Sequence, residues 1–264
     1  MDDFREDAVL VISEQHMAAL HRTAGVQFEN EMVAHGLQFA PKLAKVIGEE
    51  QLRRAIRAGS TRAQQHGFTQ RGPVRLCIEA MFLFGSAFDD DPQYPWARAI
   101  LQADAEQMTR ANRLYEKVLD YQQKVSGPDG VNTREALRKL AQLSQRPPAP
   151  PHGSIEDGVM WELANVFPEK AAYAGKEALR GLVAEGIAAA RKAGFEAARS
   201  QTAVVMLMFM FGHGCSDDLL YPWIARTLHD PRIADPAVRA DRLERKALTW
   251  LSHVLAGHKE RATA

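Results

Sequence analysis

Two segments of this chain carry closely similar sequences 127 positions apart. Residues 82–96 read FLFGSAFDDDPQYPW, and residues 209–223 read FMFGHGCSDDLLYPW. The same offset aligns positions upstream, where Pro41 matches Pro168 and Phe68 matches Phe195. Self-similarity at a fixed spacing indicates a repeated structural unit, and it constrains the fold more than any single motif does. We therefore expect a duplicated unit of about 100 residues.

The positions shared by the two segments are helix breakers, carboxylates and aromatic residues. We interpret them as a structural signature: glycine ends one helix, aspartate caps the next, proline opens it, and the aromatic rings anchor the break on its own bundle. For the aspartates, a Mg²⁺ or Ca²⁺ site and a contact with a partner remain alternatives. The signature residues are Gly85, Asp90, Asp91, Tyr94, Pro95 and Trp96 in the first copy and Gly212, Asp217, Asp218, Tyr221, Pro222 and Trp223 in the second.

Apolar residues recur at helical spacing along both copies, which predicts an all-α protein with a bundle of about five helices in each copy. Residues 105–125 are expected to form one long amphipathic helix that turns inward Met108, Leu114, Val118, Leu119 and Val125. The run Ala203–Phe211 is apolar throughout, so we expect a helix that is buried on all sides.

The repeat divides the chain into three parts. Residues 1–127 are predicted to form the first helical repeat with an N-terminal extension, and residues 155–264 the second repeat. Residues 128–154 are predicted to be a linker with a short helix and the proline-rich stretch RPPAPP, which cannot be helical. We expect the two copies to pack together about a pseudo-twofold axis rather than to remain separate.

Charge and composition restrict the partners and the compartment. The formal net charge is zero, with 33 basic and 33 acidic residues, which argues against nucleic acid and against a polybasic membrane anchor. The acidic start MDDFRED lacks the pattern of a signal peptide, and no apolar run approaches the roughly 20 residues that span a bilayer. The two cysteines, Cys77 and Cys215, are not at equivalent repeat positions. We therefore expect a cytoplasmic protein with reduced thiols.

No enzyme signature is present. The chain lacks a P-loop, GxSxG, HExxH and GxGxxG, so we predict no catalytic, cofactor or metal site. His213 lies two residues before Cys215, but the first copy has Ser86 and Phe88 there, so this pair was not duplicated. A metal-dependent hydrolase that uses the aspartates is the least favoured alternative.

One basic segment is private to the first copy. We predict its arginines to bind a partner, although a solvated helix face is the alternative explanation. They are Arg53, Arg54, Arg57 and Arg62, and the second copy has Gly181, Ala184 and Ala189 in place of the last three.

The first copy also resembles a known family. The resemblance rests on residues 28–41, 52–68 and 82–101, including Gly59, Gly67, Gly85, Pro95 and Trp96. These segments are similar to a family of small all-helical bacterial proteins encoded beside type VI secretion effectors and PAAR tip proteins. The second copy is a more divergent version, with Leu219 where the first has Pro92.

The resemblance implies a non-catalytic accessory role with a protein partner. The expected function is that of a chaperone or co-chaperone that holds an effector or its adaptor before loading. An immunity protein that neutralises a cognate toxin is the alternative. Self-association into a homo-oligomer is left open.

Overall fold

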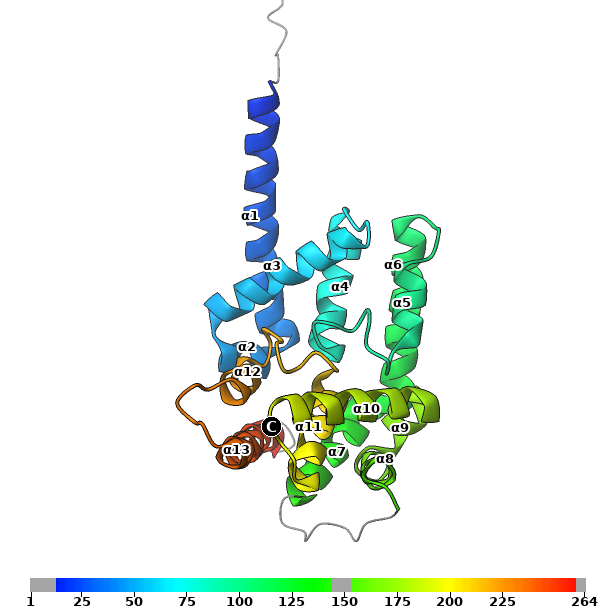
Figure 1. Ribbon diagram of the computed structural model, residues 1–264. Helices are drawn as coiled ribbons and strands as arrows, with labels where there is room; N and C mark the ends of the chain where they lie inside the picture. The colour runs from blue at the N-terminus through cyan, green and yellow to red at the C-terminus, as the bar shows by residue number, and fades with distance from the viewer. Residues whose placement is uncertain (1–12, 144–152, 260–264) are drawn as a thin grey trace, which may run out of the picture.

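The computed structural model describes residues 13–143 and 153–259, and within them all regular structure is helical (Figure 1). The predicted all-α class is therefore confirmed. The first half contains α1 (Glu14–Phe39), α2 (Pro41–Ile47), α3 (Glu49–Gln65), α4 (Arg71–Phe84), α5 (Pro95–Leu101) and α6 (Gln107–Tyr121). A π-helical turn (Gln122–Ser126) and a 3-10 turn (Pro128–Gly130) lead into α7 (Val131–Leu143). The second half contains α8 (Ile155–Val166), α9 (Pro168–Ala174), α10 (Lys176–Lys192), α11 (Ala198–Phe211), α12 (Pro222–Leu228) and α13 (Pro236–Lys259).

The helix bounds of the two halves agree at the offsets found in the sequence. The helices α2, α3, α4 and α5 begin 127 residues before α9, α10, α11 and α12. α6 and α13 begin 129 residues apart. α8 corresponds to the last dozen residues of α1, because α1 and α8 end 127 residues apart.

Both halves contribute to one hydrophobic core. Its buried side chains come from α4 and α11 above all. α4 packs mainly against α3, α6 and α1, and α11 against α10, α8 and α13. The sequence prediction for Ala203–Phe211 is close to the structure, because only Ala203 and Met210 in this run retain partial exposure. The short helix predicted in the linker is α7, whereas RPPAPP lies outside the described residues.

The two chain breaks meet at the centre of the molecule. Gly85 ends α4 and Gly212 ends α11, each with a φ of +97° that side chains rarely adopt. A Cβ on Gly212 would lie 2.6 Å from the carbonyl oxygen of Phe84, and a Cβ on Gly85 would overlap the carbonyl oxygen of Phe211. Both glycines are therefore required by backbone conformation and by the close approach of the other break.

The predicted capping role of the aspartates is wrong. Pro95 and Pro222 do open α5 and α12, but the N-cap residues are Tyr94 and Tyr221, and neither makes a side-chain capping bond. The carboxylates instead accept hydrogen bonds from the breaks themselves, as described below. The sequence could not show this, because the donors that bind the carboxylates lie near them only in the folded protein.

The predicted helix 105–125 also differs from the structure. α6 runs from Gln107 to Tyr121, and both Met108 and Leu119, which were expected to point inward, are exposed. The buried stripe of α6 consists of Ala111, Leu114, Val118 and Tyr121. α6 thus has apolar residues on two faces, and only one of them is packed.

Among the described helices, none combines the length and the hydrophobicity needed to cross a membrane.

The glycine contact gives a direct stability prediction. Gly85→Ala should destabilise the protein by about 3 kcal/mol, because it adds strain at positive φ and a clash with the opposite break. Gly25→Ala is the matched control, since a Cβ there meets nothing within 4 Å. Chemical denaturation measures both variants, and equal stability of the two would contradict the close-contact argument.

Candidate functional site

The arginines predicted to bind a partner are largely engaged within the chain. Arg53 and Arg57 of α3 both pair with Glu29 of α1, at 2.9 and 2.6 Å. These bonds hold the pKa of Glu29 below its usual value. Arg54 donates a hydrogen bond to Gln51, three residues earlier in α3, at 3.3 Å. Arg53 and Arg57 therefore fasten α3 to α1, whereas the exposed Arg54 bonds within α3.

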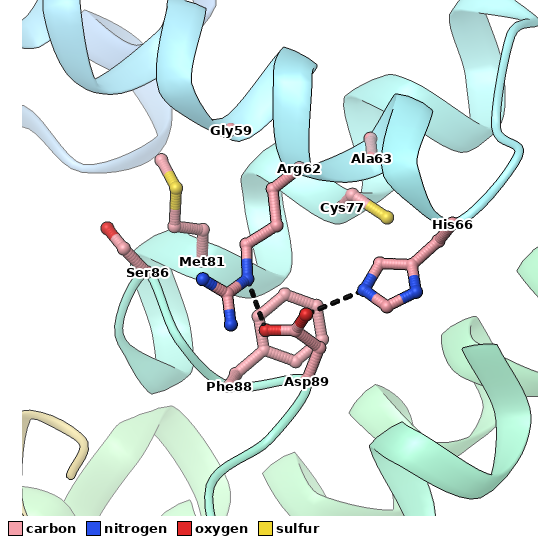
Figure 2. A pocket seen from close by; sticks show the side chains of 9 residues that line it. All are labelled: Gly59, Arg62, Ala63, His66, Cys77, Met81, Ser86, Phe88 and Asp89. Carbon is pink, nitrogen blue, oxygen red and sulfur yellow. Dashed lines mark hydrogen bonds and ion pairs between the residues drawn. The ribbon is translucent and has the colours of Figure 1, made fainter. Parts of the chain in front are cut away.

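Arg62 belongs to a different cluster, shown in Figure 2. Its Nε lies 2.5 Å from Oδ1 of Asp89, while the other carboxylate oxygen lies 2.6 Å from Nε2 of His66. Asp89 is buried, so two polar partners satisfy it. The pocket beside them is narrow, with room for about one water molecule, and Cys77 also lines it.

This cluster brings together a cysteine, a histidine and an aspartate that sequence reasoning did not connect. A thiol acts as a nucleophile only as the thiolate. Burial raises the pKa of Cys77 to about 12, so the thiol stays protonated at neutral pH. The arrangement is therefore a buried polar anchor and lacks an activated nucleophile.

Two aspartates of the signature tie the chain breaks to each other. Asp218 accepts bonds from the backbone nitrogen of Ser86 at 2.7 Å and from its hydroxyl at 2.6 Å. Asp91 accepts a bond from the backbone nitrogen of His213 at 2.7 Å. Because Ser86 and His213 occupy equivalent repeat positions, as do Asp91 and Asp218, the two bonds are reciprocal. Burial raises the pKa of both aspartates, although these hydrogen bonds favour the charged forms.

His213 extends the junction into a chain of charges. Its Nε2 lies 3.0 Å from Asp90 and its Nδ1 lies 3.1 Å from Glu185 of α10. Asp90 is also 3.1 Å from Arg62. Burial lowers the pKa of His213, but the carboxylates of Asp91, Asp90 and Glu185 outweigh it and raise the pKa overall. Both ring nitrogens are occupied, so His213 cannot serve Cys215 as a base.

A buried lysine completes the junction. Lys170 of α9 donates to the carbonyl of Phe209 and lies 5.5 Å from the centre of the Tyr94 ring. Burial lowers the pKa of Lys170 to about 8, and the charge of Asp91 opposes this change.

The remaining signature residues lie around this junction. Tyr94 and Tyr221 are buried, and Trp96 and Trp223 are partly buried against the core. Asp217 is exposed, 3.9 Å from the ring of His229. In the described part of the chain, no group of three or more histidine, cysteine, aspartate or glutamate side chains is arranged to hold a metal ion.

An apolar surface on the first half was missed by sequence reasoning. α4 packs between α1 and α6 (Figure 1). On α4, the ring of Phe82 packs near that of Phe39 of α1, with 6.2 Å between the ring centres. The ring of Phe84 packs edge-on against that of Tyr121 of α6, with 4.9 Å between the ring centres. Leu83 therefore points outward between the two neighbouring helices, and it is 40% exposed. The second apolar stripe of α6, with Tyr115 and Leu119, could have indicated this surface in the sequence.

The neighbouring helices α1 and α6 also expose large apolar residues. Phe39 is 38% exposed and Leu119 is 45% exposed. We call Phe39, Leu83 and Leu119 the α4 outer face. Tyr115 continues it along α6, because residues four apart lie on the same side of a helix.

The N-terminal part of α1 stands clear of the body of the molecule (Figure 1). Every described side chain from Glu14 to Gln27 is exposed, including the large apolar residues Met17, Leu20 and Val26. We call residues 14–27 the α1 arm.

Comparison with known proteins adds no relative: no protein-family model, curated protein or solved structure matches this chain.

The protonation of His213 predicts a pH effect on stability. Because the pKa is raised in the folded protein, the cation stabilises the fold fully below about pH 6.5. This contribution is lost as the pH rises through the folded pKa. Denaturation of the wild type and His213→Gln across pH 5.5–9 should show the wild type losing stability relative to the variant. If the free energies of unfolding of the two proteins change in parallel with pH, the raised pKa of His213 is contradicted.

The buried thiols predict low reactivity. Burial raises the pKa of Cys77 and of Cys215, so Ellman's reagent should leave both unmodified in the native protein. Both should react in denaturant. Rapid native labelling of Cys77 would instead indicate an accessible, activated thiol.

Proposed function

We propose that this chain is a non-catalytic, protein-binding accessory protein. In this role it acts as a chaperone or co-chaperone for a type VI secretion effector or its adaptor. The observation that carries the proposal is the uncovered apolar surface of the first half, which consists of the α4 outer face and the α1 arm. Clustered apolar residues on a surface are characteristic of sites that bind other proteins.

The α1 arm supports this proposal independently. An isolated helix of about 14 residues is marginal in water, and helices in proteins gain most of their stability from packing. The arm packs against nothing in the described chain, yet it carries Met17, Leu20 and Val26. A protein partner would supply the missing contacts.

We further propose that the two halves are copies of one unit packed about a pseudo-twofold axis. The matching helix bounds and the reciprocal bonds of Ser86 and His213 support this arrangement. Within such a scaffold, function lies where the halves differ. In the described residues, the α1 arm and the exposed side chains of the α4 outer face belong to the first half, so we place partner binding there.

The type VI context rests on the resemblance of the first copy to proteins of those gene clusters. The exposed apolar residues of the α4 outer face and the α1 arm support a holding role, because a bound partner would cover them. A cytoplasmic location fits the free thiols of Cys77 and Cys215 and a protein that acts before secretion.

Co-purification tests the proposal. The tagged chain is co-expressed with each neighbouring effector and adaptor, and one of them should be retained. Met17→Glu with Leu20→Glu should reduce retention at least tenfold, because charges replace exposed apolar contacts. Val238→Glu is the matched control, since Val238 is exposed on α13.

Two outcomes would contradict this proposal. If the chain elutes alone from every mixture, the protein-binding role fails. If it binds an effector and abolishes that effector's toxicity, the immunity role replaces the chaperone role.

A further inference from the structure

The second half shows how its own outer face is covered. Met210 of α11 is equivalent to Leu83, because it lies between Phe209 and Phe211 as Leu83 lies between Phe82 and Phe84. The ring centres of Phe211 and of Trp250 in α13 are 4.7 Å apart, and this pair is equivalent to Phe84 and Tyr121. The same framework of three helices is therefore present in both halves.

In the second half, α7 lies beside the two helices that flank α11. It packs against both α8 and α13, the counterparts of the end of α1 and of α6. Its amphipathic face presents Ala136, Leu137 and Leu140 to the protein. Lys139 of α7 donates to the carbonyl of Asn165 at the end of α8, at 3.2 Å, which fixes its position.

The described residues of the first half include no helix in the corresponding place. Apart from α4 itself, no helix in the described part of the chain packs extensively on both α1 and α6. The exposures follow this difference: Phe39 is 38% exposed, whereas its equivalent Val166 is 1% exposed. Leu83 and Leu119 are exposed, whereas their equivalents Met210 and Leu248 are partly buried.

We propose that the α4 outer face binds an amphipathic helix of the partner protein, in the place that α7 takes on the second half. The helix has three to four turns, about 20 Å, with apolar residues spaced as Ala136, Leu137 and Leu140 are in α7. This inference rests on the proposed protein-binding function and assigns the class of segment that the site accepts.

A helical peptide provides the probe. The peptide carries residues 131–143, a fluorophore, and a hydrocarbon staple that replaces Arg138 and Gln142, both exposed and four residues apart. The staple maintains the helix, so a lack of binding cannot be attributed to an unfolded peptide. Anisotropy titrations with the full chain should saturate, and hydrogen exchange should slow in α4 and α6.

Matched variants locate the binding. Leu83→Glu with Leu119→Glu should weaken binding at least tenfold, and these exposed positions leave folding unaffected. Val238→Glu in the full chain should bind like the wild type. A stapled peptide with Leu137→Glu and Leu140→Glu should not bind.

Several results would overturn the inference. No saturable binding, undiminished binding by the Leu83→Glu, Leu119→Glu chain, or protection confined to the second half would each do so. A dimer in light scattering that the same substitutions dissociate would assign the face to a second copy of this chain. If an effector or adaptor co-purifies equally with that double variant, the proposed function stands and this inference alone fails.

Discussion

The fold depends on the contact between the two chain breaks, where the backbones of Gly85 and Gly212 approach each other too closely for a Cβ. A buried break leaves backbone N–H groups without helical partners, and such groups must be satisfied. Asp91 and Asp218 supply the acceptors, each for the break of the other half. The glycines allow the two breaks to approach each other, and the aspartates satisfy the backbone N–H groups that this approach buries. The same residue types therefore recur in both segments.

Ion pairs at this junction also link the two halves of the chain. Arg62 and His213 are residues in which the copies differ, and both belong to the chain that runs from Asp89 through Asp90 to Glu185. Arg53 and Arg57 are paired with Glu29. Basic residues that look available in sequence are thus largely neutralised by contacts that join α1 to α3 and one half to the other.

The two halves differ most in what covers their central helices. α7 packs across the second half, whereas the corresponding face of the first half exposes Phe39, Leu83 and Leu119. The α1 arm projects from the same half. In the described residues, the exposed apolar side chains of α1, α4 and α6 thus lie on the first half, away from the contacts that join the two breaks.

The sequence by itself determined the helical class, the positions of both breaks and the apolar helix at Ala203–Phe211, because these follow from local periodicity, glycine and proline. It did not determine what Asp91 and Asp218 bind, since their donors are more than 120 residues away in the chain. The sequence also predicted wrongly that Met108 and Leu119 of α6 are buried. Hydrophobicity alone does not show whether a residue on a helix is packed or exposed. Only the tertiary structure decided which apolar stripe is buried, because burial depends on which neighbouring helix is present. Among the described residues of the first half, no helix besides α4 packs extensively on both α1 and α6 as α7 packs on α8 and α13.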